Sequence, residues 1–290
     1  MELVKLSATP PSIVYPLPVL AFLLFSLSGN RDIFGLLVAI AFNFTSQAGI
    51  NLWNHLNDVE EDRLAGKVNV LIEHPETRVV AIILSFLLYA LSFFILYLFS
   101  RDRKFALAAF FVVSILTLAY SDRSALGKRR LKNYYLTEVF TYVVSVPLYT
   151  LTVWTIYSSI NSRAFAVALF MTPFALSGTF LKDIKDASSD EKAGLRTLAV
   201  VFSPSALLKV SVALLWCYYF LLALFSILGV IPERSMIALA FSVALLYSNY
   251  RYAKEDWIVS GKLLKPLKIM VLSNLLSLVF LAAVNLAPLP

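Results

Sequence analysis

The sequence contains a single cysteine and only two histidines among its 290 residues. One thiol cannot form an internal disulfide, and so few cysteines and histidines cannot supply the ligands of a structural zinc site. Charged residues are also scarce, at 15%, against about 25% in a typical soluble protein. Hydrophobic residues make up 59% of the chain, more than a soluble domain of this length can cover with polar side chains. The composition therefore indicates an integral membrane protein.

Long apolar runs predict how the chain crosses the membrane. A spanning helix needs about 20 predominantly apolar residues, and runs of this kind predict an all-α protein with about nine transmembrane helices. The first run lacks a strongly basic segment before it and an Ala-x-Ala sequence after it, so we expect a helix rather than a signal peptide. The expected spans are 13–29, 33–57, 78–99, 104–121, 136–157, 163–181, 205–229, 234–251 and 266–287. We expect one transmembrane domain over residues 1–290.

The distribution of positive charge predicts the orientation. The net charge is +7, and a membrane protein carries such an excess in its cytoplasmic loops and against anionic headgroups. With the N-terminus in the cytoplasm and the C-terminus outside, most of the 25 Lys and Arg residues fall on the cytoplasmic side. The outer side holds Arg31, Arg101, Arg103, Lys104, Arg163 and Arg234. Because the chain has no soluble basic domain, we expect no nucleic-acid partner.

Two of the expected helices end in acidic segments, both on the cytoplasmic side. Intervals of three or four residues put the polar side chains of each segment on one face of a helix. Like charges at this spacing destabilise a helix, so the carboxylates need a positive partner. Hard oxygen ligands favour Mg²⁺, which completes its shell with water and phosphate oxygens. The residues are Asn54, Asp58 and Asp62 in the first segment and Asp183, Asp186 and Asp190 in the second.

Side chains near the acidic segments are candidates for binding a diphosphate. Glu60 and Glu61 point away from the first face, so we expect them to be solvated. Tyr120 can hydrogen-bond a phosphate or stack on a cation, but anchoring at the membrane interface is an open alternative. The basic candidates have the same alternative, which is binding to headgroups. They are Lys67, Lys128, Arg129, Arg130 and Lys182.

These motifs resemble those of the UbiA superfamily of intramembrane prenyltransferases. Asn54, Asp58 and Asp62 fall on its first motif, Asn-Asp-x-x-Asp-x-x-x-Asp, and Asp183, Asp186 and Asp190 on its second, Asp-x-x-Asp-x-x-x-Asp. The family commonly continues with glycine and Thr-Leu, as in Gly194 and Thr197-Leu198 here. Tyr120-Ser121, followed by a basic loop, also resembles the family. His55 departs from it, because the second acid of the first motif often stands there.

The resemblance implies a fold and a reaction. It implies a helical bundle around a central cavity that opens to the cytoplasmic side and to lipid. It implies Mg²⁺-dependent transfer of an isoprenyl group from a prenyl diphosphate to a lipophilic acceptor, either an aromatic quinone precursor or a prenylated glycerol phosphate. The catalytic metal ligands would be Asp58, Asp62, Asp183 and Asp186, helped by Asn54 and Asp190. Tyr120, Ser121 and the basic candidates would bind substrate. The oligomeric state stays open.

Other functions fit the sequence less well. A multi-span transporter that binds a cation or anion would place charged groups or unwound segments near helix centres, whereas these aspartates stand at helix ends. A phosphotransferase that forms phospholipids would carry an Asp-Gly signature, which is missing. Soluble prenyl synthases share aspartate-rich motifs but not the membrane spans.

Overall fold

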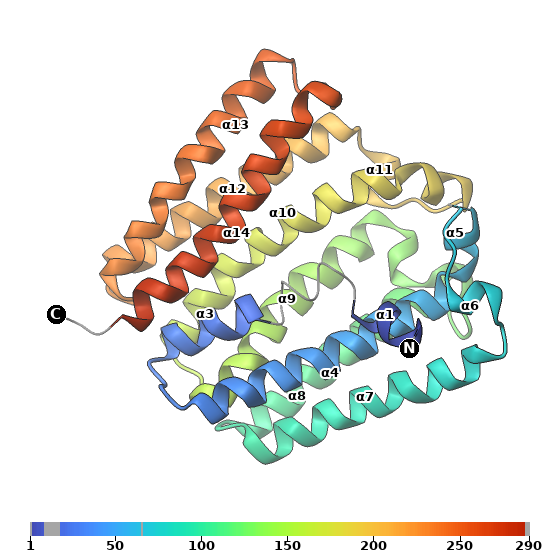
Figure 1. Ribbon diagram of the computed structural model, residues 1–290, viewed down its shortest axis with the longest axis horizontal. Coiled ribbons are helices and arrows are strands. Elements are labelled where there is room, and N and C mark those ends of the chain that lie inside the picture. Colours follow the sequence, from blue (N-terminus) through green and yellow to red (C-terminus); the bar gives the residue numbers. More distant parts are fainter. Residues whose placement is uncertain (1, 9–17, 65, 288–290) are drawn as a thin grey trace.

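The computed structural model describes residues 2–8, 18–64 and 66–287, most of which lie in helices (Figure 1). The first helices are α1 (Glu2–Ser7), α3 (Pro18–Ser28), α4 (Ile33–Asn57), α5 (Val59–Leu64), α6 (Val70–Glu73), α7 (Thr77–Phe99) and α8 (Arg103–Ser121). They are followed by α9 (Tyr135–Tyr157), α10 (Ser162–Lys192), α11 (Leu198–Val201), α12 (Pro204–Ile227), α13 (Ser242–Lys254) and α14 (Leu264–Leu286). Short 3₁₀ helices are η1 (Gly127–Arg129), η2 (Leu131–Asn133), η3 (Glu233–Phe241) and η4 (Gly261–Leu263). Among the described residues the one extended pairing is an isolated bridge between Tyr134 and Arg196, so the all-α prediction is confirmed.

Seven segments of the described chain are long and apolar enough to cross a membrane, and they lie in α4, α7, α8, α9, α10, α12 and α14. Two other expected spans are less regular. The span expected at 13–29 falls on α3, which has 11 residues, and partly on residues 9–17, which lie outside the described chain. The span expected at 234–251 is divided between η3 and α13. A multi-pass helical membrane protein is thus confirmed, but the number of nine uniform spans is not.

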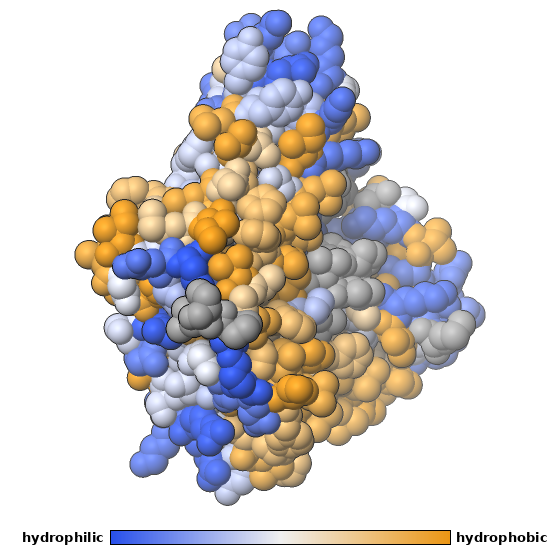
Figure 2. Space-filling model, turned by 60° about the vertical axis from the view of Figure 1, so that its left-hand side comes forward, coloured by the Kyte–Doolittle hydropathy of each residue, from blue (hydrophilic) through white to orange (hydrophobic). Residues whose placement is uncertain are grey.

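The surface between the two ends of the bundle is apolar. Along α7, for example, Val79, Ile83, Leu87 and Phe94 are exposed. Figure 2 shows hydrophobic side chains covering much of one face of the molecule, with hydrophilic residues gathered toward its margins. Such a surface is unfavourable in water and suits the hydrocarbon of a bilayer.

Helix ends in this bundle are fixed by local capping. The Asp32 carboxylate accepts a hydrogen bond from the Phe34 N–H, 3.0 Å, and so caps α4. Ser203 caps α12 through the Ala206 N–H, 3.2 Å, and Pro204 fits the first helical turn because its missing N–H would have no partner there.

Two pairs of helices carry the acidic segments to one end of the bundle. α4 packs alongside α7, α10 packs alongside α12, and α9 lies between the two groups, in contact with both α8 and α10. The short helices α5, α6 and α11 gather at the right-hand end in Figure 1. The first acidic segment covers the junction of α4 and α5, and the second lies near the end of α10. The fold therefore brings both segments to the same end.

Candidate functional site

The first acidic segment is not a single helix. α4 ends at Asn57, its C-cap Asp58 has φ −101° and ψ 12°, and α5 begins at Val59. Hydrogen bonds cross the break, from the Asp58 N–H to the Asn54 carbonyl (2.9 Å) and from the Asp62 N–H to the Asp58 carbonyl (2.8 Å). The backbone thus distorts at Asp58, while the hydrogen bonds from Asp58 to Asn54 and from Asp62 to Asp58 keep the four-residue spacing of a helix across the break.

Asp58 is held by two cations from the loop between α8 and α9. The Lys132 ammonium group bonds to Asp58 Oδ1, and Arg130 Nη1 lies 3.4 Å from the same oxygen. Arg130 and Lys132 are both buried, and a buried cation needs a partner of opposite charge. The two side chains thus bring positive charge directly to the first acidic segment.

Asp62 is buried and contacts three polar side chains. Lys67 Nζ lies 3.0 Å from Asp62 Oδ1, and His55 Nδ1 and Asn69 Nδ2 each lie 3.4 Å from Oδ2. Burial alone would raise the pKa of Asp62, but the hydrogen bonds and charges of His55 and Lys67 outweigh it and lower the pKa below its usual value. Asp62 is therefore ionised at neutral pH.

Glu61 was expected to be solvated, and this prediction was wrong. Glu61 is buried, its Oε1 bonds to Arg130, and Arg123 Nη1 lies 3.5 Å from its Oε2. Burial favours the neutral acid, but the positive charges of Lys132 and Arg130 and a backbone hydrogen bond lower the pKa of Glu61. The backbone distortion at Asp58 and the packing of the basic loop explain the difference. Glu60 is exposed and pairs with Arg123, in agreement with a position at the surface.

The second acidic segment lies on α10, which continues without a break to Lys192. Asp183 and Asp190 are half-buried, whereas the side chain of Asp186 lies outside what the structure describes. Asp190 Oδ2 accepts a hydrogen bond from the Thr197 hydroxyl, 3.0 Å. Lys182 is exposed.

The two acidic segments approach each other. α5 packs against α10, and the hydroxyl of Tyr142 on α9 lies within electrostatic reach of both Asp58 and Asp183. The turn after the second segment also meets the loop between α8 and α9. The Arg196 N–H donates to the Asn133 carbonyl, 3.0 Å, and the Tyr135 N–H donates to the Arg196 carbonyl, 2.9 Å. The basic loop, the first segment and the turn after the second segment thus form one polar site.

The loop between α8 and α9 divides into residues that face the site and residues that do not. Of the three basic residues predicted to bind substrate there, Arg130 faces the carboxylates, Arg129 is exposed, and the side chain of Lys128 lies outside the described part. Lys132 was not among the residues predicted to bind substrate, although it stands shortly before an apolar helix, where a charged residue is a functional candidate.

The end of α8 contacts both the first segment and α9. The Ser121 hydroxyl donates to Asn54 Oδ1, 2.7 Å. The Tyr120 hydroxyl donates to Glu138 Oε1, 3.1 Å, and lies 2.8 Å from the hydroxyl of Tyr142. Tyr120 therefore lies beside the acidic segments, and its alternative role as an isolated membrane anchor does not fit these contacts. Glu138 and Tyr142 also belong to the site, and the sequence analysis missed both.

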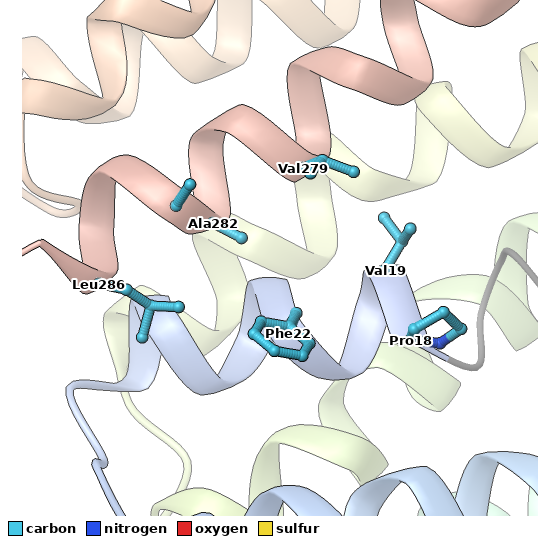
Figure 3. A pocket seen from close by; sticks show the side chains of 7 residues that line it. Pro18, Val19, Phe22, Val279, Ala282 and Leu286 are labelled. Atoms are coloured by element: carbon cyan, nitrogen blue, oxygen red, sulfur yellow. The ribbon is translucent and has the colours of Figure 1, made fainter.

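Two cavities differ in their chemistry. A polar cavity of about 340 Å³ lies between the basic loop and the turn after α10. Its lining includes Glu61, Arg123, Arg130, Asn133 and Arg196. An apolar cavity of about 260 Å³ lies between α3 and α14, where Phe22 points toward the gap (Figure 3). Its lining has no group that could bind a metal or an anion.

The donor atoms of the site suit a hard divalent cation. They are carboxylate and amide oxygens, and cations lie close enough to bind the anion that would accompany the metal. Among the described side chains, no three from His, Cys, Asp or Glu are grouped closely enough to hold a metal by themselves. Mg²⁺ does not require such a group, because it takes one or two protein carboxylates and completes its shell with water and phosphate oxygens. The residues present therefore fit Mg²⁺ together with a phosphate ligand.

Several solved structures share this fold. A UbiA homolog from Archaeoglobus fulgidus, bound to GPP and Mg²⁺, is 18% identical, with a TM-score of 0.70 and coverage of 99% of this chain and 100% of the other. A UbiA homolog from Aeropyrum pernix K1 is 15% identical, with a TM-score of 0.63 and coverage of 92% and 95%. A digeranylgeranylglyceryl phosphate synthase is 19% identical, with a TM-score of 0.67 and coverage of 97% and 99%. At these identities the likeness shows the fold alone.

The sequence comparisons show the family. An uncharacterized protein from Archaeoglobus fulgidus is 39% identical over 278 residues, which cover 94% of this chain and 95% of the relative. Residues 15–275 match the sequence profile of the UbiA prenyltransferase family. With the matching helical fold, this assignment covers most of the chain. The protein belongs to the UbiA prenyltransferase family.

Proposed function

We propose that this protein transfers an isoprenyl group from a prenyl diphosphate to a lipophilic acceptor within the membrane, and that the reaction depends on Mg²⁺. The observation that carries the proposal is the meeting of two aspartate segments with buried Lys132 and Arg130 at one end of an apolar bundle. Such a site combines metal ligands with cations for a diphosphate, next to a bilayer that dissolves the prenyl chain. The Archaeoglobus homolog that binds GPP and Mg²⁺ supports this reading.

The residues of the site have distinct proposed roles. Asp58, Asp62, Asp183 and Asp186 would hold Mg²⁺, with Asn54 and Asp190 as further ligands or orienting groups. Mg²⁺ in such a site stabilises the negative charge that develops on the departing diphosphate. Lys67, Arg130 and Lys132 carry the positive charge that binds the remaining phosphate oxygens. Lys128, Arg129 and Lys182 belong to this group as well, in the outer part of the site.

The aromatic side chains would act on the prenyl group. Its reacting carbon becomes cation-like as the diphosphate leaves, and aromatic faces stabilise a cation. Tyr120 and Tyr142 lie with ring centroids 5.6 Å apart, beside the acidic segments. The apolar bundle keeps water away from the cation, which water would otherwise capture. Ser121 orients Asn54 through its hydrogen bond.

The acceptor and the orientation are part of the proposal. We propose a lipophilic acceptor, either an aromatic quinone precursor or a prenylated glycerol phosphate, which reaches a central cavity from the lipid and the cytoplasmic side. The excess of Lys and Arg on the side of the acidic segments favours a cytoplasmic N-terminus and an outside C-terminus. One transmembrane domain, residues 1–290, would carry the whole activity.

The experiment uses the purified protein in lipid nanodiscs. It is given geranyl and geranylgeranyl diphosphate with each class of acceptor, in Mg²⁺ or in EDTA. We expect a prenylated product in Mg²⁺ alone, and a loss of at least about 100-fold for Asp58→Asn or Asp183→Asn, because charge stabilisation of this kind contributes about that much. The control is Glu233→Gln, which changes an exposed acid at the opposite end of the bundle. Activity in EDTA equal to that in Mg²⁺, or full activity of both Asp58→Asn and Asp183→Asn, would contradict the proposal. Ion flux through the protein in liposomes, without any prenylated product, would also contradict it.

A further inference from the structure

Glu138 is a buried carboxylate whose two oxygens bind different parts of the fold. It lies in the first turn of α9 and is 2% exposed. Glu138 Oε1 accepts a hydrogen bond from the Tyr120 hydroxyl, 3.1 Å, and Oε2 accepts one from the Leu198 N–H, 3.0 Å. Tyr120 is at the end of α8, and Leu198 begins α11. A buried carboxylate is costly unless it is hydrogen-bonded, and here neither partner belongs to α9 itself.

One arm of this arrangement leads to the first acidic segment. Tyr120 is followed by Ser121, whose hydroxyl donates to Asn54 Oδ1 at 2.7 Å. Asn54 is the residue whose carbonyl accepts the hydrogen bond of the Asp58 N–H. The position of Glu138 therefore fixes the end of α8, and the end of α8 contacts the point where the first segment changes direction.

The other arm leads to the second acidic segment. Leu198 is preceded by Thr197, whose hydroxyl donates to Asp190 Oδ2 at 3.0 Å. The chain between them turns sharply, since the Leu195 N–H donates to the Asp190 carbonyl at 2.9 Å. Fixing the Leu198 N–H on Glu138 therefore fixes the turn that ends α10.

Glu138 also sets the direction of a hydrogen-bond chain. The Tyr120 hydroxyl has one proton, which it donates to Glu138, so the Tyr142 hydroxyl at 2.8 Å must donate to the Tyr120 oxygen. Tyr142 is one helical turn after Glu138, and its hydroxyl is the group within reach of both Asp58 and Asp183. The orientation of the Tyr142 hydroxyl thus depends on Glu138.

We propose that Glu138 is a positioning residue that fixes the two acidic segments at a constant distance and orientation relative to each other. The proposal rests on the proposed function, because the distance between the segments affects binding only if both segments bind one ligand. An acidic residue in the first helical turn also has a simpler explanation, the favourable interaction with the helix dipole. That interaction does not require contacts with α8 and α11, and Glu138 makes both.

The first experiment measures the distance between the segments in the absence of metal and substrate. Spin labels are placed on Arg63→Cys and Lys192→Cys, two exposed positions beside the segments, after Cys217→Ser removes the native thiol. The distance distribution is recorded by double electron–electron resonance for otherwise native protein and for Glu138→Ala, Glu138→Gln and Tyr120→Phe. The matched control is Thr141→Val, which removes an equally buried hydroxyl that bonds only to the carbonyl of its own helix.

We expect the distribution to become at least twofold broader in Glu138→Ala and to broaden in Tyr120→Phe, which breaks one arm alone. Glu138→Gln keeps an oxygen that accepts from the Leu198 N–H and gains an N–H that can donate to the Tyr120 hydroxyl, so both arms persist and the native width should be restored. Thr141→Val should not change the width. A native distribution in Glu138→Ala would overturn the proposal. A distance distribution as broad in Glu138→Gln as in Glu138→Ala would also overturn it, because the charge of Glu138 rather than its hydrogen bonds would then fix the distance between the segments. If Glu138→Ala does not fold, the Tyr120→Phe and Gln variants decide the result.

A second measurement separates this inference from the proposed function. Thermal unfolding is followed at increasing Mg²⁺ concentration in the presence of inorganic pyrophosphate. The Mg²⁺ concentration that gives half of the maximal stabilisation should rise at least tenfold in Glu138→Ala. In Glu138→Gln it should rise less than threefold. An unchanged Mg²⁺ requirement in Glu138→Ala would overturn the inference. If the native protein shows no stabilisation at all, the proposed metal site fails, while the distance measurement still decides the role of Glu138.

Discussion

Asp62 and Asp190 occupy the same position in the turns that end their helices. The carbonyl of each accepts a hydrogen bond from the N–H five residues later, at 2.9 Å in both cases. A glycine stands four residues after each aspartate, with φ +69° at Gly66 and φ +72° at Gly194. This pattern is a Schellman turn, in which glycine takes the left-handed conformation. The last aspartate of each acidic segment is thus placed by the same backbone device.

This relationship predicts a matched effect of two substitutions. Gly66→Ala and Gly194→Ala should each destabilise the protein by about 1–2 kcal/mol, because an L-residue in the left-handed region is strained. The added Cβ has open space at both positions, so the strain comes from the backbone alone. Thermal unfolding in detergent measures the effect. Gly178→Ala is the control, because this glycine lies inside α10 without positive φ and its replacement should leave the midpoint unchanged or raise it. Equal midpoints for all three variants would contradict the prediction.

Lys132 should matter far more than its neighbour Arg129. Lys132 is buried against Asp58, whereas Arg129 is exposed. Hydrogen bonds to charged groups contribute about 1.5–3 kcal/mol, so Lys132→Met should lower kcat/KM for the prenyl diphosphate by about 10- to 100-fold. Arg129→Gln, in the exposed outer part of the site, should lower it by no more than about fivefold, because an exposed charge pair contributes at most about 1 kcal/mol. Steady-state kinetics in nanodiscs provides the measurement, and comparable losses in the two variants would show that general positive charge, rather than the contact with Asp58, is what counts.

The helices and the two acidic segments were predictable because their signals are local. Runs of apolar residues long enough to span a bilayer identify α4, α7 and α10, and the interval between Asp183 and Asp190 correctly places both on one helix. These features depend only on residues that are close in the chain. The weaker signal of η3–α13 predicted one span that the structure divides, and the span expected at 13–29 is only partly described, as α3.

The details of the site were less predictable because they depend on contacts between distant segments. The expected solvation of Glu61 assumed an unbroken helix, but the chain distorts at Asp58 and a loop about 70 residues later covers the segment. Lys132 and Glu138 belong to that loop and to the helix after it. Their position at the start of an apolar helix was a signal, since charges there are expensive and usually functional. The partners of these charges, however, could not be read from the sequence.

The lowered pKa values of Glu61 and Asp62 predict acid sensitivity. A carboxyl group whose pKa is lower in the folded than in the unfolded protein contributes stability above its unfolded pKa and loses it as the pH falls through the folded pKa. The unfolding temperature should therefore fall as the pH is lowered from about 5 to 3. Glu61→Gln should reduce the slope, because the neutral amide cannot be protonated in this range. The measurement is made in EDTA, and an identical slope for the variant would contradict the assignment.

The opposite end of the bundle is held by arginines, which explains part of the positive charge that lies away from the acidic segments. Arg163 donates from Nε to the Val230 carbonyl and from Nη1 to the Leu27 carbonyl, each at 3.1 Å. It therefore joins the start of α10 to the turn after α12 and to the last turn of α3, where the final carbonyls have no partners within the helix. These bonds also explain why the positive charge of Arg163 is favourable there, since helix C-termini carry partial negative charge.

Removing this arginine should destabilise the fold without impairing the reaction. Arg163→Ala leaves two carbonyls without donors, so a loss of about 1–3 kcal/mol is expected. The unfolding midpoint in detergent should fall, while the KM for prenyl diphosphate at a temperature where both proteins are folded should stay within twofold. Lys104→Ala, an exposed position at the same end, is the control and should change neither quantity. If Arg163→Ala raised the KM as strongly as Lys132→Met does, the two ends of the bundle would be coupled, and the assignment of chemistry to one end and structural support to the other would be wrong.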